Sequence, residues 1–221
     1  MVVAQPLKYM PWWTIAYVAS VAAIQVIPGL SEYLIYDRSA LAHGELWRLF
    51  SAHMVHFSSA HLLNNLLVLA PAALLVEMRY REDFVKVVAV SALAIGLALY
   101  LFQANIDRYA GASGISLALL VYGALRGLWD RNRRWRIVCS VVLAVVATKI
   151  TAEILFDWQT TDWENGSGFV TVTLSHVTGT IVGMAIGLAR TSGCGQHSRL
   201  AKRISGSSAA PVATKVQPSR M

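Results

Sequence analysis

Long apolar runs without any charged residue dominate the chain and are separated by short polar segments. Asp, Glu, Lys and Arg are absent from residues 9–31, 49–76, 87–106, 109–125 and 165–189. A membrane-spanning helix needs about 20 apolar residues, so these stretches are long enough, or nearly so, to hold one span each. Residues 137–156 form a further stretch of suitable length, although Lys149 and Glu153 interrupt it.

The pattern predicts an all-α, polytopic membrane protein with six transmembrane helices. The expected spans are residues 12–30, 59–78, 85–104, 112–129, 137–156 and 169–189. Residues 1–190 would form one membrane domain, and residues 191–221, rich in Ser, Ala, Gly and Pro, would form a disordered basic cytoplasmic tail. The first span could instead be a signal peptide with Lys8 as its charged part, but no convincing small-residue cleavage site follows it.

Composition and charge favour a membrane protein. Apolar residues make up 56% of the chain, charged residues 14%, and the mean hydropathy is +0.51. Soluble domains are nearer about 45–50% apolar and about 25% charged, so a soluble enzyme or a nucleic-acid module is disfavoured. The net charge of +7 is instead explained by the orientation of the chain in the membrane. With both termini in the cytoplasm, most of the 19 Lys and Arg residues fall in cytoplasmic segments, which is the positive-inside pattern.

A serine and a histidine in different spans are predicted to form a nucleophile–base pair. Ser113 opens the fourth span, where a helix N-terminus favours developing negative charge. His176 lies in the sixth span and shares one face with Gly179 and Gly183, which allow another helix to approach closely. From the 1.5 Å rise per residue, both side chains are expected within about 10 Å of the outer boundary. Such a pair is the arrangement of nucleophilic catalysis.

Further polar residues at the same depth are expected to surround Ser113. His61 and Asn65 are four residues apart and share one face of the second span. With the Ser113 backbone N–H, they are predicted to hold an oxyanion. Gly111 and Gly114 flank the serine and permit a tight turn and close backbone approach.

Lys149 and Glu153 in the fifth span are predicted to be a structural pair. They lie one turn apart, and the lysine stem can extend toward the outer interface, near which Glu153 is expected. A gating role is the alternative, because ionisable residues inside a membrane are costly and often functional. No acidic residue is then placed to orient His176, so we expect a Ser–His dyad whose histidine is held by packing and backbone contacts.

Each motif taken alone has a plainer interpretation. A Gly-Ala-Ser-Gly string is typical of helix packing, and a membrane histidine is often a structural hydrogen-bond partner. His53, His56 and His61 could bind a metal or haem, as in a metal-binding protein or a transporter. No carboxylate or cysteine nearby completes a ligand set, however, so neither a metal nor another cofactor is predicted.

Together, the motifs resemble those of the rhomboid intramembrane serine proteases over about residues 12–190. Their order and spacing fit the family in five places. These are Trp47 and Arg48 in the first outer loop; His56, His61 and Asn65 around the start of the second helix; Glu77 and Arg79 at its inner end; residues 111–114 around the nucleophile; and His176, Gly179 and Gly183 in the sixth helix.

The resemblance implies a serine endopeptidase that hydrolyses a peptide bond in or near the transmembrane segment of a substrate. Ser113 would be the nucleophile and His176 the general base, without a cofactor. The fifth helix and residues 157–167 would gate substrate access. Transmembrane proteins and membrane lipid would be the partners, with no nucleic acid and no obligate protein partner. A bacterial inner membrane fits best, with both termini in the cytoplasm.

The chain also departs from the family pattern. Leu117 stands where many members carry a Tyr that packs on the catalytic histidine. A catalytically inactive relative that binds transmembrane clients is therefore the alternative function. The short form, with Tyr36-Asp37-Arg38 ahead of Trp47-Arg48, is similar to the rhombosortase branch. That branch is associated with processing proteins that carry a C-terminal Gly-Gly sorting tail in Gram-negative bacteria.

Overall fold

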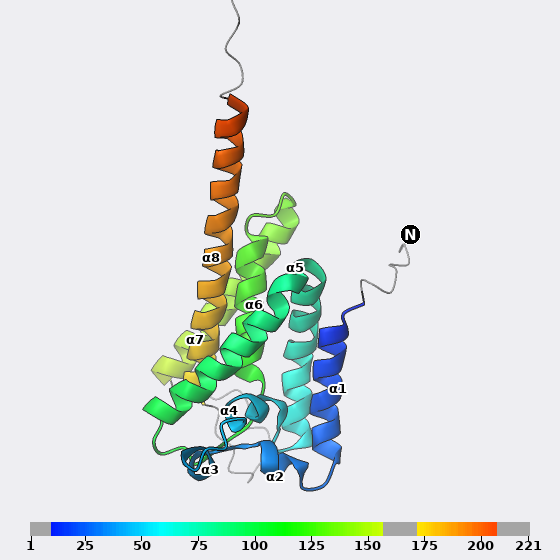
Figure 1. The fold of residues 1–221 in the computed structure, drawn as a ribbon, viewed down its shortest axis with the longest axis vertical. Helices are drawn as coiled ribbons and strands as arrows, with labels where there is room; N and C mark the ends of the chain where they lie inside the picture. The colour runs from blue at the N-terminus through cyan, green and yellow to red at the C-terminus, as the bar shows by residue number, and fades with distance from the viewer. Residues whose placement is uncertain (1–9, 157–171, 207–221) are drawn as a thin grey trace, which may run out of the picture.

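The structure is a computed structural model that describes residues 10–156 and 172–206, with side chains described up to residue 190 (Figure 1). Its long elements are all α-helices, in agreement with the predicted fold class. They are α1 (Trp12–Val26), α5 (Ser59–Phe102), α6 (Ser113–Gly127), α7 (Arg133–Phe156) and α8 (Thr173–Gly206). Helix α6 packs against α5, α7 and α8 and is therefore the central helix of the bundle.

The second and third expected spans form one continuous helix with a sharp break. Helix α5 has 44 residues, and Tyr80 within it has the non-helical dihedral angles φ −141° and ψ 46°. The chain reverses its direction there, so that the two arms of α5 lie on opposite sides of the turn in Figure 1. Among the described helices, α5 and α7 are long and apolar enough to cross a membrane. Helices α1 and α6 are apolar but have 15 residues each, so the six-span count stays a prediction.

Helix α8 is longer than its sequence pattern predicts. It continues to Gly206, into the segment from residue 191 onward for which we expected a disordered tail. Helix formation propagates at little cost from a turn that is already formed, and Leu200, Ala201, Lys202 and Arg203 are all good helix formers. Residues 207–221, the remainder of the expected tail, lie outside the described residues.

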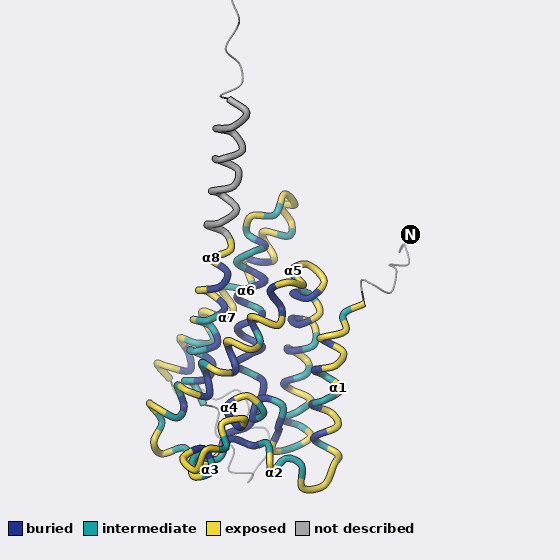
Figure 2. The backbone as a smooth tube through the Cα atoms, in the orientation of Figure 1, coloured by how far each residue is buried: buried dark blue, intermediate teal, exposed yellow. Residues whose placement is uncertain are grey.

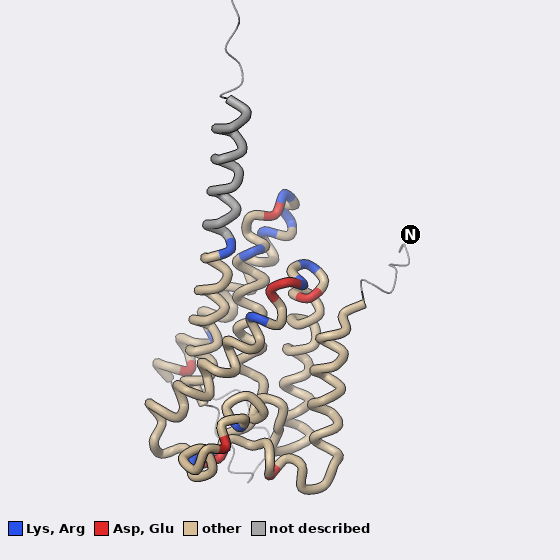
Figure 3. Tube along the Cα trace, viewed as in Figure 1, with Lys and Arg blue, Asp and Glu red and all other residues tan. Residues whose placement is uncertain are grey.

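Exposed positions alternate with buried ones along the helices of the bundle (Figure 2), and many of the exposed residues are large and apolar. Exposed examples occur on α5, α7 and α8, and include Leu63, Leu67, Leu97, Val141, Val145 and Ile181. Water-soluble monomers rarely expose apolar surface on this scale, so these faces are suited to contact with lipid. Lys and Arg instead gather at the end where α5 turns back and α6 passes into α7 (Figure 3).

Short elements between α1 and α5 close the other end of the bundle. They are α2 (Leu30–Leu34), β1 (Tyr36–Asp37), α3 (Arg38–Ala42), α4 (Arg48–Ser51) and the 3-10 helix η2 (Ala52–Met54). Strand β1 pairs in antiparallel fashion with β2 (Arg108–Tyr109), with Tyr36 opposite Tyr109 and Asp37 opposite Arg108. This pairing fastens the segment that leads into α6, and it thereby restrains the position of the first residue of α6.

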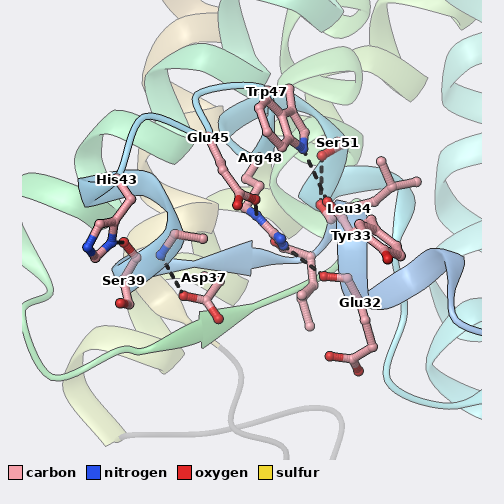
Figure 4. Close-up of polar contacts among 12 residues, drawn as sticks. Glu32, Tyr33, Leu34, Asp37, Ser39, His43, Glu45, Trp47, Arg48 and Ser51 are labelled. Carbon is pink, nitrogen blue, oxygen red and sulfur yellow. Dashed lines mark hydrogen bonds and ion pairs between the residues drawn. The ribbon is translucent and has the colours of Figure 1, made fainter.

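Trp47 and Arg48 hold this end together through hydrogen bonds to backbone carbonyls (Figure 4). The Arg48 side chain is buried, donates to the carbonyls of Glu32 and Ile35 at 2.8 and 2.7 Å, and pairs with Glu45 at 2.7 Å. Trp47 Nε1 donates to the carbonyl of Tyr33 at 3.1 Å. A guanidinium has five donors in a fixed geometry, so one arginine can satisfy several carbonyls that no regular element pairs.

Glu77 and Arg79 fasten the opposite end of the bundle. The Glu77 carboxylate, which is buried, accepts from the backbone N–H of Trp13 at 3.1 Å and of Thr14 at 2.7 Å. Both donors lie in the first turn of α1, where N–H groups have no partner within the helix. Arg79 pairs with Asp130 and lies over the ring of Trp135 at 4.9 Å. Glu77 therefore caps α1, and Arg79 ties α5 to the connection between α6 and α7.

Replacing Glu77 with alanine is expected to destabilise the docking of α1. The buried N–H of Thr14 and the partly buried N–H of Trp13 lose their acceptor, which costs about 1–3 kcal/mol of folding free energy and lowers the melting temperature. Thermal unfolding of the detergent-solubilised protein measures this change. Glu82→Ala is the matched control, because Glu82 is an exposed glutamate of the same helix. Equal melting temperatures for the two variants would show that the cap contributes nothing.

Candidate active site

Close backbone packing between α6 and α8 brings the neighbourhoods of Ser113 and His176 together. Ser113 is the first residue of α6 and is half-buried, and His176 is buried in the first turn of α8. A Cβ atom at Gly114 would lie 2.7 Å from the Ser175 carbonyl oxygen, and one at Gly179 would overlap the Gly114 carbonyl. The two backbones thus touch directly beside both predicted catalytic residues, at the end of the bundle where α6 and α8 begin (Figure 1).

The same close packing continues along α8. A Cβ atom at Gly183 would overlap the Ala118 carbonyl of α6. Gly179 and Gly183 are therefore required as small residues at the α6–α8 contact, where only a hydrogen atom fits between the backbones. This is the use that the sequence predicted for them.

The His176 ring contacts a carboxylate, contrary to the sequence-based expectation. Nδ1 of His176 lies 2.8 and 2.9 Å from the two carboxylate oxygens of Glu153 on α7. Lys149 Nζ contacts the same carboxylate and lies 3.3 Å from His176 Nδ1. The prediction that no acid is placed to orient the histidine was therefore wrong. The sequence carried a signal, a charged residue inside an apolar span, but it did not show which neighbour that residue faces.

Nε2, the other nitrogen of the His176 ring, is buried and has no hydrogen-bond partner among the described residues. A buried ring nitrogen without a partner is uncommon, because burying an unpaired polar group costs free energy. Such a nitrogen can accept a proton from a nearby hydroxyl. The ring therefore makes polar contacts through Nδ1, whereas Nε2 has no described partner.

Gly111 and its neighbours form a rigid turn before Ser113. Gly111 has φ +128°, a conformation that side-chain-bearing residues rarely adopt, and its N–H donates to the Ala52 carbonyl at 3.1 Å. Its carbonyl accepts from the Tyr109 hydroxyl at 3.2 Å and lies 3.3 Å from His53 Nδ1. The sequence singled out His53 only as one member of a histidine cluster. The structure shows that it fixes the turn that presents Ser113.

His61 and Asn65 lie in the first turns of α5, and both side chains are buried. The ring of His61 faces Gly111, since a Cβ atom at Gly111 would lie 3.0 Å from His61 Cε1. Asn65 Nδ2 donates to the His61 carbonyl at 3.0 Å. The His56 ring packs edge-on against the ring of His61 at 4.9 Å. Burial, with His61 close by, lowers the pKa of His56 to about 3, so this ring is neutral and acts in packing.

No group of three or more His, Cys, Asp or Glu side chains in the described part of the chain is arranged to hold a metal ion. His56 and His61 are close, but their rings pack against each other rather than converge on one point. The described groups around Ser113 are hydrogen-bond donors, acceptors and one carboxylate. Their chemistry is that of proton transfer and oxyanion binding.

Leu117 packs toward α7. It is buried in a cluster with Val121 of α6 and Val146 of α7, against which Ile150 is partly buried. An aliphatic side chain at this position thus forms the seam between α6 and α7. Glu153 lies one turn beyond Ile150 on α7, and this seam therefore brings its carboxylate toward His176.

The chain belongs to the rhomboid family, since the family model of the rhomboid domain matches residues 43–192, more than half of its length. The chain resembles the rhomboid protease GlpG of Salmonella paratyphi A, with 30% identity over 148 residues, and that of Salmonella choleraesuis, with 31% over 148 residues. Both alignments cover 66% of this chain and 49% of the relative, so the chain spans about half the length of the curated relatives it matches. Rhomboid proteins are integral to the membrane, and helices α5 and α7 of this chain are long and apolar enough to cross one.

Proposed function

We propose that this protein is an intramembrane serine endopeptidase in which Ser113 is the nucleophile and His176 the general base. The observation that supports the proposal is the backbone contact of Gly114 with Ser175 and Gly179, which are neighbours of Ser113 and His176 in the chain. In addition, His176 Nε2 is buried and has no described partner. His176 Nε2 takes the Ser113 proton as Oγ attacks the scissile carbonyl, and it then gives the proton to the leaving amine. A water molecule repeats the sequence on the acyl-enzyme and releases the acid product.

The oxyanion of the tetrahedral intermediate would be held beside the start of α6. The Ser113 N–H has no acceptor within its helix, and the helix dipole favours negative charge at this point. Asn65 Nδ2 has a second hydrogen beyond the one that it donates to His61, and the His61 ring faces Gly111. Gly114 is required beside the nucleophile because Ser175 of α8 leaves no room for a side chain.

The proposed substrates are membrane proteins that are cut in or near a transmembrane segment. The substrate must unwind locally, since the carbonyls of an intact helix are already hydrogen-bonded and shielded. Small residues are expected at the scissile bond because packed helices surround the site. Processing of C-terminal sorting tails, as in the rhombosortase branch, is the more specific role, supported by the resemblance of Tyr36-Asp37-Arg38 and Trp47-Arg48 to that branch. The clustering of Lys and Arg in Figure 3 favours an orientation with both termini in the cytoplasm, and the proposed location is a bacterial inner membrane.

Labelling with a fluorophosphonate probe tests the proposed function without knowledge of the substrate. The probe forms a covalent bond with an activated serine, and mass mapping then identifies the modified residue. We expect modification at Ser113, with a rate that falls at least about 1,000-fold in His176→Ala because the proton acceptor is removed. Folded wild-type protein that remains unlabelled would instead support an inactive relative that binds transmembrane clients.

A further inference from the structure

The Glu153 carboxylate is almost fully buried, and among the described residues its partners are Lys149 and His176. Its side chain is 2% exposed, and its oxygens contact the ammonium of Lys149 and Nδ1 of His176. Burying a carboxylate is costly unless charges and hydrogen bonds compensate it. Lys149 supplies the opposite charge, and its side chain is 29% exposed, so the lysine reaches the carboxylate from the periphery. An ion pair with Lys149 does not by itself require the Glu153 carboxylate to be buried. Its position against His176 therefore indicates a role toward the histidine.

The contacts decide which ring nitrogen of His176 carries the proton. An ionised carboxylate only accepts hydrogen bonds, so its two contacts at 2.8 and 2.9 Å require a hydrogen on Nδ1. The opposite tautomer would need Lys149 to donate to Nδ1, from the longer distance of 3.3 Å, and would leave the carboxylate facing a lone pair. The hydrogen is therefore on Nδ1, and Nε2 carries the lone pair that a general base requires.

Helix α7 is held in the position that this contact needs by its seam with α6. Leu117 and Val121 of α6 pack on Val146 of α7, with Ile150 beside them. Glu153 lies one turn beyond Ile150 on α7, so the seam fixes the helix that carries the carboxylate to the His176 ring.

We propose that Glu153 is a positioning residue for His176, whose Nδ1–H donates to its carboxylate, and that Lys149 keeps this carboxylate ionised. The proposal rests on the proposed function of Ser113 and His176. Glu153 fixes the tautomer and the orientation of the ring and stabilises the imidazolium that forms when Ser113 loses its proton. The site then works as a serine–histidine–glutamate triad, with the acid supplied by α7.

The test compares fluorophosphonate inactivation of wild type with Glu153→Gln, Glu153→Asp and the double variant Lys149→Met/Glu153→Gln. The maximal inactivation rate kinact reports activation of the serine, and KI reports binding of the probe. Glutamine can donate its amide to Nδ1 and stabilise the wrong tautomer, so kinact should fall at least about 100-fold while KI stays within about threefold. Glu153→Asp keeps the carboxylate and should retain more activity than Glu153→Gln. Thr151→Ala, an exposed position of α7, is the matched control.

The double variant separates positioning from charge neutralisation. It contains no unpaired lysine, so thermal unfolding should show wild-type stability even if Glu153→Gln alone unfolds. If Glu153 positions His176, kinact of the double variant stays at least about 100-fold below wild type. Recovery to within about threefold would overturn the proposal and leave Glu153 as a partner of Lys149 only. If wild type and Glu153→Gln cleave and label at Ser113 equally well, the role of Glu153 is overturned, whereas the proposed function of Ser113 and His176 is retained. Absence of wild-type labelling would overturn both.

Discussion

Replacing Ser113 with alanine is expected to abolish cleavage of a transmembrane reporter substrate. The proposed nucleophile is lost, so kcat/KM should fall at least about 10⁴-fold. The measurement uses purified protein in liposomes and a fluorescent reporter whose transmembrane segment has small residues near its outer end. Fold and expression should not change, because the Ser113 side chain is only half-buried and the helix start is held by the Gly111 turn.

Ser116→Ala provides the matched control for this loss. Ser116 lies in the same helix, is buried, and its hydroxyl donates to the Ala112 carbonyl at 3.0 Å. Its hydroxyl is thus committed to its own helix, and alanine is a good helix former, so activity should stay within about threefold of wild type. If Ser113→Ala cleaves as fast as Ser116→Ala, the nucleophile lies elsewhere.

Substituting alanine for Gly179 is expected to have the second-largest effect. The new Cβ atom would overlap the Gly114 carbonyl, which belongs to the backbone and cannot rotate away. Helices α6 and α8 must then move apart, and Ser113 and His176 move with them. A displacement of about 1 Å between reacting groups costs about 100-fold in rate, and overpacking costs about 1–3 kcal/mol of stability. Fluorophosphonate labelling and thermal unfolding of the same preparation measure both quantities.

Gly187→Ala is the matched control for Gly179→Ala on the same helix. The nearest atoms to a Cβ at Gly187 are side-chain carbons of Leu125 at 3.2 and 3.3 Å, which can give way. We expect near-normal labelling and a melting temperature within a few degrees of wild type, since a change of about 1 kcal/mol shifts the melting temperature of a domain this size by about 2–4 °C. Similar losses in both variants would mean that the helix tolerates no added methyl group, and the close approach at Gly114 would not explain the effect.

Leu117 shows why an unusual residue is better understood from its neighbours than from the family pattern alone. Taken by itself, the missing aromatic residue weakens the support expected for His176 and favours an inactive relative. In the folded protein, the same leucine packs on α7, and α7 presents a carboxylate to the histidine. The leucine at position 117 is therefore accompanied by a contact between Glu153 and His176, which can orient the histidine ring.

The sequence by itself determined the helical class, the membrane character and the motifs that identify the family. These properties are local: apolar runs of sufficient length predict spans, and Ser113, His176 and the glycines beside them are recognisable from spacing alone. It also placed both residues at one depth, because the rise of a helix per residue is fixed. The rhomboid family membership that the motifs predicted was confirmed by the match over residues 43–192.

The tertiary structure alone decided which side chains meet. Apolar periodicity does not distinguish a face that contacts lipid from one that contacts a neighbouring helix, because both are apolar in a membrane protein. For that reason the sequence left Glu153 as a partner of Lys149 and His53 without a role, whereas packing brings the first to His176 and the second to Gly111. The break at Tyr80 and the extension of α8 to Gly206 likewise depend on how the helices pack and propagate, which no single residue type signals.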